Sequence, residues 1–416
     1  MRPTRRHFLA GSAVSLAVGM TGIARAAIAE AQTLKPIKLP SPIGTAERLD
    51  RLARVRKLMA ANNIGSVIVE AGPSLDYLTG VQWWRSERLT AAVIPVEGDP
   101  IIVTPFFEKP SVAESLNIPA EIRTWNEDEE PLKLVADFLR ERGVAGASIG
   151  MEETNRFWIA DRLRQQLPTA QIVSANPVVR AVRMRKTAAE IALMQAASDI
   201  TIAAFRHAWP RVKAGMTPSD IDALIGTATR ALGGEYDGGL ILIGEATAYP
   251  HGSHKPQIVG KGSNVLFDCG CKVHGYSSDI SRSFVWGAAP TAHQRKVWDQ
   301  VARGQQIAMQ AAQLGNPAGS VDDAVRAAYT SWGYGPGYAL PGLSHRTGHG
   351  IGLEGHEPVN LVHGEMTPLD VGMCFSNEPG IYIPGAFGIR LEDCFHMTPD
   401  GPRFFSEPPK SLDAPV

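Results

Sequence analysis

Ionisable side chains interrupt segments of the C-terminal half that otherwise have the composition of buried strands. Residues 266–270, 276–280 and 389–393 each place a carboxylate beside apolar residues, and residues 374–380 place another before Pro-Gly. The glycine-rich stretch 348–352 carries a histidine. Burying an unpaired carboxylate costs roughly several kcal/mol, so these groups need a compensating charge in the folded chain. The side chains concerned are Asp268, Asp279, His349, Glu378 and Glu392.

Two divalent cations would supply that charge, because two ions a few ångströms apart can share bridging carboxylates and a bridging water. Such ions lower the pKa of the water, so hydroxide is available near neutral pH, and they polarise a substrate carbonyl. A ligand set of mostly oxygen with one nitrogen favours Mn²⁺, with Co²⁺, Fe²⁺ and Zn²⁺ left open. The pattern therefore predicts a metal-dependent enzyme with a two-metal site.

The first 26 residues have the layout of an export signal. Arg5 and Arg6 precede an apolar run rich in Ala, Gly and Ser, and an Ala-x-Ala site follows at 24–26. The paired arginines favour the twin-arginine route, with an ordinary Sec signal or an uncleaved anchor as the alternatives. We therefore expect an exported, periplasmic protein.

Sequence patterns divide the rest of the chain into a linker at 27–46, an N-terminal domain at 47–180 and a second domain at 183–410. Strands are predicted at 66–69, 91–95 and 101–104 and helices at 131–142 and 157–166, which alternate as in an α/β domain. The second domain begins with a capping box at Thr187 and Glu190. Thr217 and Pro218 start another helix, which should end at Gly233. The order helix pair, strands, helix pair, strands suggests an internally duplicated αβ unit.

Composition excludes several partners. Lys and Arg number 41 and Asp and Glu 42, so no excess of positive charge suggests nucleic acid. No stretch after residue 30 is expected to approach the length of a membrane span, so no stable span should remain after signal removal.

The four cysteines are expected to be buried apolar residues. Two of them, Cys269 and Cys271, are too close in the sequence for an unstrained disulfide bridge.

At the ionisable segments the chain resembles the creatinase and methionine-aminopeptidase family, metallopeptidase family M24, and within it the proline-specific branch. The resemblance covers the chain from about residue 183 and extends more loosely over the N-terminal domain through residues 76–80. It implies an α/β N-terminal domain followed by an α+β catalytic domain with the pita-bread fold. The matching stretches are 267–270, 275–282, 345–352, 376–382 and 388–393.

The resemblance assigns a metal-binding role to each ionisable residue. Asp268 would chelate one metal ion, and His349 and Glu378 would bind the other. Asp279 and Glu392 would bridge both ions. Glu378 also takes the position of the group that accepts a proton from the attacking water, so the family mechanism is hydrolysis by a metal-bridging hydroxide.

Five further residues match substrate-site positions of the family. His251 corresponds to the histidine that approaches the scissile amide, and His345 and His356 to two more that line the substrate site. Arg390, two residues before the last of the ligands, would project to the same face and stabilise that ligand. Tyr382 is expected to line the substrate pocket.

The implied substrate is a peptide with proline at the second position, cleaved before the proline by an Xaa-Pro aminopeptidase or an Xaa-Pro dipeptidase. The resemblance also implies a homodimer, since relatives use the region of Trp83 and Trp84 to close the active site, sometimes across a dimer. Two alternatives remain open. One is a metal-dependent enzyme of the same fold that acts on a non-peptide C–N or C–S bond, and the other is a non-catalytic peptide-binding module.

Overall fold

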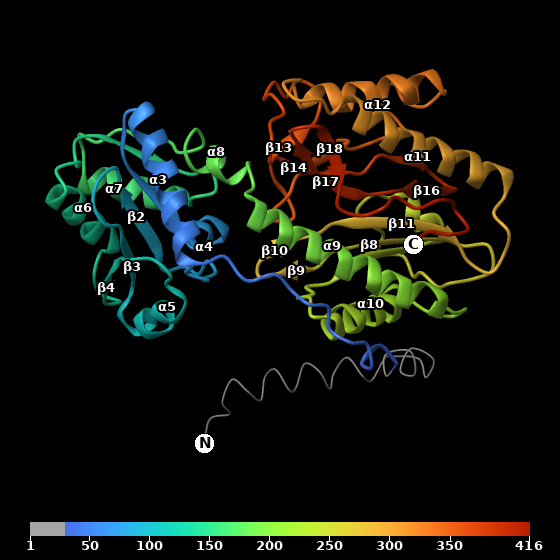
Figure 1. The fold of residues 1–416 in the computed structure, drawn as a ribbon, viewed down its shortest axis with the longest axis horizontal. Coiled ribbons are helices and arrows are strands. Elements are labelled where there is room, and N and C mark those ends of the chain that lie inside the picture. The colour runs from blue at the N-terminus through green and yellow to red at the C-terminus, as the bar shows by residue number, and fades with distance from the viewer. Residues whose placement is uncertain (1–29) are drawn as a thin grey trace. The chain divides into compact units, whose positions relative to one another are not determined.

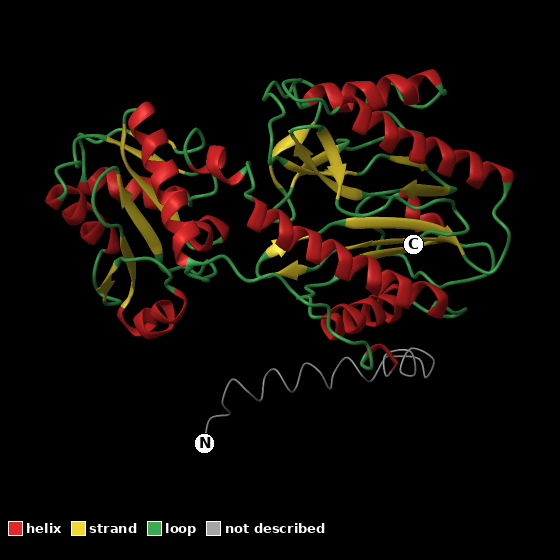
Figure 2. Ribbon diagram, viewed as in Figure 1, coloured by secondary structure: helices red, strands yellow, loops and turns green. Residues whose placement is uncertain are grey.

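The computed structural model describes residues 30–416, which form two compact units (Figures 1 and 2). The N-terminal unit spans Ser41–Lys186. The C-terminal unit combines Thr187–Val416 with residues 30–40. The export signal predicted at 1–26 lies outside the described residues.

The N-terminal unit is built around one mixed sheet with the strand order β4-β3-β2-β1-β5-β6. Its strands are β1 (Ile64–Glu70), β2 (Ala91–Pro95), β3 (Ile101–Pro105), β4 (Glu121–Trp125), β5 (Ser148–Met151) and β6 (Ile172–Ser174). Its helices are α3 (Thr45–Ala61), α4 (Pro73–Thr79), α5 (Lys109–Ser115), α6 (Pro131–Glu141), α7 (Phe157–Gln166) and α8 (Val179–Arg183). β1 pairs antiparallel with β2 and parallel with β5.

The composition of the central strands explains their position. Every residue of β1, β2 and β3 is buried, as expected for strands that are covered on both faces. From α6, Leu132, Val135 and Phe138 join these strands in one apolar core. All the strands and helices predicted for this domain occur, with small shifts at their ends, and the predicted α/β class is confirmed.

The C-terminal unit alternates helix pairs with groups of strands. Its helices are α9 (Ala188–Ala208), α10 (Pro218–Leu232), α11 (Ala292–Ala311) and α12 (Gly319–Ser331), with short 3-10 turns η3 (Trp209–Arg211) and η4 (Gly244–Ala248). The first group of strands is β7 (Gly239–Ile243), β8 (Asn264–Cys269), β9 (Lys272–Val273), β10 (Tyr276–Ser277) and β11 (Ile280–Val285). The second group is β12 (Gly348–Gly350), β13 (Glu357–Leu361), β14 (Cys374–Asn377), β15 (Gly380–Ile383), β16 (Phe387–Arg390), β17 (Asp393–Thr398) and β18 (Gly401–Phe404).

The two helix pairs enclose the strands of this unit (Figure 1). α9 packs on α10 beside the three-stranded sheet β11-β8-β7, and α11 packs on α12 beside the five-stranded sheet β13-β12-β14-β17-β18. The predicted order of helix pairs and strands is therefore present. The two halves differ in the number and order of their strands, so the repeat is limited to the general layout.

Local signals set the ends of two long helices. The Thr187 hydroxyl accepts a hydrogen bond from the Glu190 backbone N–H, and the Glu190 carboxylate accepts one from the Thr187 N–H, which forms the predicted capping box of α9. Thr217 caps α10 in the same way, with Asp220 as its partner. Gly233 ends α10 in the left-handed conformation, at a φ of 102°.

Thr217→Ala is expected to lower the free energy of unfolding by about 1 kcal/mol. The Asp220 N–H would lose its side-chain acceptor, and the Asp220 carboxylate would lose the Thr217 hydroxyl that donates to it at 2.8 Å. Chemical denaturation measures the difference. Thr217→Ser keeps the hydroxyl and should unfold close to the wild type, so an equal loss in both variants would contradict the cap as the cause.

One described segment is long and apolar enough to cross a membrane, judged by length and composition alone. It is Ala188–Arg211, with a mean hydropathy of 1.3 in its most apolar part, of which 61% is buried inside the structure. The prediction that no stretch after residue 30 approaches the length of a membrane span is wrong for this segment. Its contacts with α10 and with β9, β10 and β11 show that its apolar side chains pack inside the C-terminal unit.

Residues 30–40, which fall in the predicted linker at 27–46, pack on the C-terminal unit. Glu30 pairs with Arg211 at 2.8 Å, and the Ile37 N–H donates to the Leu232 carbonyl at 2.9 Å. Ala31 is fully buried. α3 begins at Thr45, just before the predicted end of the linker.

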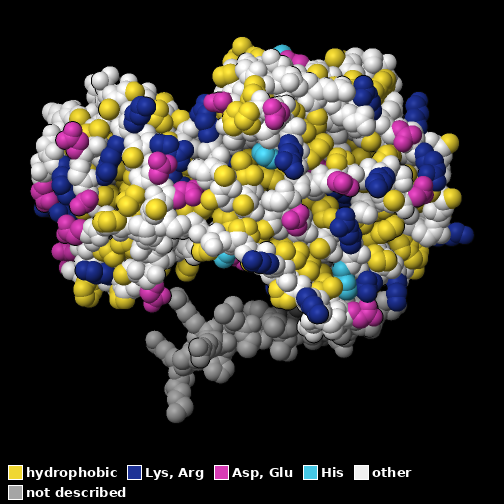
Figure 3. All heavy atoms as spheres, viewed as in Figure 1, with side chains coloured by type: hydrophobic (Ala, Val, Ile, Leu, Met, Phe, Trp, Pro, Cys, Tyr) yellow, Lys and Arg dark blue, Asp and Glu magenta, His cyan; other side chains and the backbone are white. Residues whose placement is uncertain are grey.

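Charged side chains of both signs are interspersed on the face of the molecule shown in Figure 3. A nucleic-acid-binding face would concentrate Lys and Arg. This view shows no such concentration, in line with the formal net charge of -1.

Candidate metal centre

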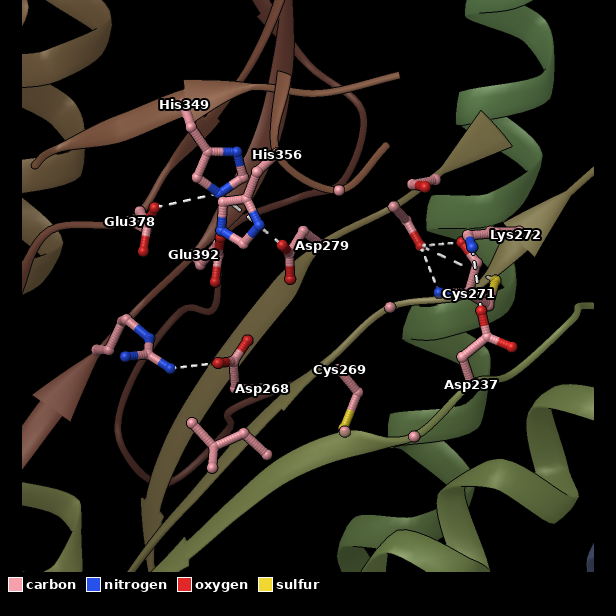
Figure 4. A pocket seen from close by; sticks show the side chains of 18 of the residues that line it. Asp237, Asp268, Cys269, Cys271, Lys272, Asp279, His349, His356, Glu378 and Glu392 are labelled. Atoms are coloured by element: carbon pink, nitrogen blue, oxygen red, sulfur yellow. Dashed lines mark hydrogen bonds and ion pairs between the residues drawn. The ribbon is translucent and has the colours of Figure 1, made fainter. Parts of the chain in front are cut away.

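Both groups of strands in the C-terminal unit contribute ionisable side chains to one cavity of about 550 Å³ (Figure 4). Asp268 lies in β8, and Asp279 directly precedes β11, which pairs antiparallel with β8. His349 is the middle residue of β12, and Glu378 directly follows β14. Glu392 lies between β16 and β17. The structure thus brings all five predicted ligand residues to the lining of one cavity.

Ser281 joins the two groups of strands at this cavity. Its backbone N–H donates to the Glu392 carbonyl at 3.2 Å, and the Glu392 N–H donates back at 3.1 Å. The Ser281 hydroxyl donates to Oε2 of the same glutamate at 2.7 Å. Since Ser281 is also the direct partner of Asp268 in the β8–β11 pairing, one serine aligns a carboxylate from each group of strands.

Gly270 allows the segment between Asp268 and Asp279 to fold back on itself. A Cβ atom at this position would lie 1.9 Å from the backbone oxygen of Ser278, which no side chain can do without moving the backbone. Glycine is therefore required for close approach of the two aspartate-bearing strands.

The ionisable groups crowd together. Nε2 of His349 is 3.3 Å from Oε1 of Glu378 and 3.9 Å from Oδ2 of Asp279. One ligand atom from each of Asp279, His349 and Glu392 can be chosen so that all three lie within 4.8 Å of one another. Asp268 differs from the others in that its carboxylate pairs with Arg390.

The hydrogen bonding of His349 shows that a cation fits here. Its Nδ1 lies 3.0 Å from the Gly350 carbonyl, which can only accept, so Nδ1 carries the hydrogen. Burial, and next the neighbouring His356, lowers the pKa of His349 to about 3, so the ring is neutral and Nε2 presents a lone pair. That lone pair faces carboxylate oxygens of Glu378 and Asp279. A divalent cation among these atoms would turn repulsion into coordination, and the donor set of oxygens with one imidazole nitrogen suits such an ion.

The carboxylates themselves are unfavourable as anions without a cation. Burial raises the pKa of Glu378 to about 7. Burial and the charges of Asp268 and Glu378 raise the pKa of Asp279, and burial and the charge of Asp279 raise the pKa of Glu392. In the metal-free protein protons would therefore take the place of metal ions.

Metal-free protein is expected to become less stable as the pH rises from about 4.5 to 7, the ordinary and the raised pKa of Glu378. Between these values folded Glu378 binds more protons than unfolded Glu378, so this carboxyl lowers the free energy of unfolding as the pH rises. The raised pKa values of Asp279 and Glu392 act in the same direction. The lowered pKa values of His345 and His349 act in the opposite direction, but these rings are neutral in the folded metal-loaded protein as well, so their effect cancels in the comparison with it. Thermal unfolding of chelator-treated protein across this range measures the effect, with metal-loaded protein as the control. A midpoint that increases over the range only in the metal-free protein would contradict the prediction.

Arg390 lies at the centre of the polar contacts around the cavity. One guanidinium nitrogen pairs with the Asp268 carboxylate, Nε donates to the Ser281 hydroxyl at 3.1 Å, and Nη1 donates to the Tyr382 hydroxyl at 3.2 Å. The predicted support of Glu392 by Arg390 is therefore indirect and passes through Ser281. Both side chains line the same cavity, as expected for residues that project to one side.

His345 and Tyr382 form a pair beside this network. His345 Nδ1 is 2.8 Å from the Arg346 carbonyl, so Nδ1 carries the hydrogen and donates to that carbonyl. Nε2 then accepts a hydrogen bond from the Tyr382 hydroxyl at 2.7 Å. Burial, and next the charge of Arg390, lowers the pKa of His345 to about 3. Burial raises the pKa of Tyr382 to about 12. Neither side chain is among the residues that line the cavity in the described part of the chain, and their roles toward a substrate stay predictions.

His251 and His356 do line the cavity. The His356 ring lies 4.1 Å from the His349 ring, measured between centroids, with 45° between their planes. The turn that carries His251 is anchored because the preceding carbonyl, of Pro250, accepts a hydrogen bond from Arg390 at 3.0 Å.

A buried aspartate that the sequence analysis missed organises the segment around His345. Asp322 of α12 is fully buried, and its carboxylate accepts hydrogen bonds from the Thr347 N–H at 3.0 Å and hydroxyl at 2.7 Å. Asp322 also pairs with Arg326 at 2.7 Å, and Arg326 donates to the His345 carbonyl. The available signal was the placement of Asp322 and Arg326 four residues apart in a predicted helix, the spacing of an ion pair on one helix face.

The cysteines agree with their predicted role. All four, Cys269, Cys271, Cys374 and Cys394, are buried thiols that form no disulfide. Burial raises the pKa values of Cys269 and Cys271, so both are neutral thiols at neutral pH. Both border the cavity without joining the ligand cluster.

Comparisons with known proteins identify the two units. The sequence model of the creatinase/prolidase N-terminal domain matches residues 51–185, and that of metallopeptidase family M24 matches residues 192–399. An Xaa-Pro dipeptidase of Lactobacillus helveticus is 32% identical over 352 residues, which cover 82% of this chain and 92% of the relative.

Solved structures agree. The dipeptidase PepE from Mycobacterium ulcerans matches with a TM-score of 0.80 at 30% identity, over 89% of this chain and 99% of that one. A prolidase from Thermococcus sibiricus matches with a TM-score of 0.77 at 26% identity, over 86% and 96%. The predicted fold class is thereby confirmed, with a creatinase-type α/β domain followed by a pita-bread catalytic domain. The chain belongs to metallopeptidase family M24, in its proline-specific branch.

Proposed function

We propose that this protein hydrolyses the peptide bond that precedes a proline at the second position of short peptides. The observation that carries the proposal is the cluster of His349, Glu378 and Asp279, in which an imidazole lone pair faces two carboxylates. The names of two relatives, an Xaa-Pro dipeptidase and a prolidase, support the choice of substrate.

Two divalent metal ions would occupy the centre. The residues that would hold them are Asp268, Asp279, His349, Glu378 and Glu392. When bound, the ions would supply hydroxide at neutral pH and polarisation of the scissile carbonyl. The oxygen-rich donor set favours Mn²⁺ over thiolate-seeking ions, and metal analysis of the purified protein separates it from Co²⁺, Fe²⁺ and Zn²⁺.

Side chains of the cavity would move the protons and hold the substrate. Glu378, which lines the cavity beside His349, is placed to accept a proton from water and to return it to the leaving prolyl nitrogen. The nitrogen of an Xaa-Pro bond carries no hydrogen, so it cannot donate a hydrogen bond to the protein. The carbonyl oxygen of that bond is the acceptor on which hydrogen-bond donors of the protein would act. Burial lowers the pKa of His356, which makes it a neutral donor beside the cluster. Arg390 and Ser281 hold Asp268 and Glu392 in place.

Dipeptides are the expected substrates. The Lactobacillus and Mycobacterium ulcerans relatives are both named as dipeptidases. Longer Xaa-Pro peptides are the alternative, which a length series separates from dipeptides.

Export to the periplasm and homodimer formation are further parts of the proposal. The paired arginines and the Ala-x-Ala site at 1–26 support export. Cell fractionation and light scattering of the mature protein test these two points, and a cytoplasmic location or a monomer would overturn the respective one.

The test of the reaction uses the mature chain loaded with Mn²⁺. Xaa-Pro dipeptides, longer Xaa-Pro peptides and proline-free controls are incubated with it, and the products are followed by mass spectrometry. Release of the first residue from Xaa-Pro substrates alone is the expected result. Two bound metal ions without cleavage of any peptide would favour a non-peptide C–N or C–S reaction. Binding of peptides without metal or cleavage would favour a binding module.

A further inference from the structure

One part of the cavity lining is polar but lies outside the ligand cluster. It consists of Glu235, Asp237, Lys272 and Ser277, here called the acidic end. Figure 4 labels Asp237 and Lys272, away from the ligand residues. The four side chains belong together through Lys272. Its backbone exchanges two 2.9 Å hydrogen bonds with Glu235, its Nζ pairs with Asp237 at 3.0 Å, and it lies directly opposite Ser277 in the β9–β10 pairing.

One polar group of the acidic end, the Ser277 hydroxyl, lacks a hydrogen-bond partner in the part of the chain that the structure describes. The residue is only 4% exposed, and within the described chain its hydroxyl has no hydrogen-bond partner. Buried hydroxyls in folded proteins nearly always have one. Because Ser277 lines the cavity, a ligand in the cavity can supply the missing hydrogen bond.

The charges of the acidic end select the kind of ligand. Lys272 neutralises Asp237, while the Glu235 carboxylate has no cation beside it among the described side chains. The end therefore carries one uncompensated negative charge and favours a cationic group. An anionic ligand could use Lys272 and Ser277 as donors, but it would face both carboxylates.

Only one variable part of an Xaa-Pro substrate fits such a site. The proline ring carries no charge, and the carboxylate at the end of a dipeptide would be repelled. The α-amino group lies on the carbon next to the scissile carbonyl, so it must stay near the ligand cluster. The side chain of the first residue is free to reach the acidic end.

We propose that the acidic end is a subsite for the first residue of the substrate and selects lysine or arginine there. The ammonium or guanidinium group donates hydrogen bonds to Glu235 and to the Ser277 hydroxyl, while Lys272 stays with Asp237. This subsite rests on the proposed Xaa-Pro hydrolysis and adds a specificity to it.

The test compares kcat/KM for Lys-Pro, Arg-Pro, Glu-Pro and norleucine-Pro, in which norleucine matches the length of the lysine chain without its charge. The wild type is expected to prefer Lys-Pro to norleucine-Pro by roughly 10-fold, the value of one charge-assisted hydrogen bond. The preference should shrink with added salt, because screening weakens exposed charge pairs.

Variants of the acidic end test which side chains cause this preference. Glu235→Gln and Ser277→Ala should each reduce the Lys-Pro to norleucine-Pro ratio, and Lys272→Met should increase it. Asp400→Asn, which removes an exposed carboxylate in the β17–β18 turn outside the cavity lining, is the matched control and should leave the ratio unchanged. Equal ratios in the wild type and Glu235→Gln, or a preference for Glu-Pro, would overturn the subsite.

Failure of the subsite and failure of the reaction can be told apart. Cleavage of norleucine-Pro without any Lys-Pro advantage would leave the proposed function standing and remove the subsite. If no Xaa-Pro peptide is cleaved, titration calorimetry on the same metal-loaded protein compares the binding affinities of Lys-Pro and norleucine-Pro and so tests the subsite independently of the reaction. Tighter binding of Lys-Pro that is lost in Glu235→Gln supports the subsite, and equal binding overturns it.

Discussion

Asp279→Asn is expected to abolish hydrolysis and at the same time to raise the thermal stability of the metal-free protein. Burial and the charges of Asp268 and Glu378 raise the pKa of Asp279 in the folded chain, so its ionised form destabilises that state. The amide has nearly the same shape and no charge. It cannot bridge two cations, and kcat/KM should fall by at least about 100-fold, since even residues behind the ligands of metal sites cost 10–100-fold.

Three measurements check this result. Elemental analysis should show less metal in the variant, calorimetry of chelator-treated protein should show a higher unfolding midpoint, and the stabilisation on adding Mn²⁺ should shrink. Asp400→Asn, remote from the cavity, should change none of these. A variant that keeps its metal and its activity would remove Asp279 from the proposed ligands.

Arg282→Met is expected to destabilise the protein by about 3–5 kcal/mol, the cost of leaving a buried charge without its partner. Arg282 is 1% exposed and pairs with the fully buried Asp393 at 2.6 Å. It also donates to the carbonyls of Ser281 and Glu392, at 3.0 and 2.9 Å. Methionine fills a similar volume, so the packing should change little. The loss of stability would come mainly from the Asp393 carboxylate, which would stay buried without its cationic partner.

Denaturant unfolding followed by fluorescence measures the change. Arg295→Met is the matched control, because Arg295 pairs with Asp413 at the surface, where the two side chains are 45% and 53% exposed. Water solvates both charges there, so the control should unfold close to the wild type. A similar small shift in both variants would contradict the structural role of the Arg282–Asp393 pair. Loss of activity in Arg282→Met without loss of stability would contradict it as well.

The metal centre was predictable from the kind of residue at each position. A carboxylate or histidine among apolar strand residues is unfavourable unless it serves a site, and this holds before any contact is known. The partners of these residues were not predictable in the same way. Arg390 was expected to support Glu392, two residues away, but it pairs with Asp268, 122 residues away. Tyr382 was expected to line the substrate pocket, and its hydrogen bonds with Arg390 and His345 were not foreseen.

The sequence by itself determined the features that depend on short separations. The capping boxes at Thr187 and Thr217, the glycine end of α10 and the strands β1, β2 and β3 follow from groups within a few residues of each other, whose geometry the local backbone dictates. Tertiary structure alone decided which distant groups meet. The register that places Ser281 against both Asp268 and Glu392, and the packing of α12 that brings Asp322 to Thr347, depend on how whole strands and helices pack. No local pattern encodes that packing.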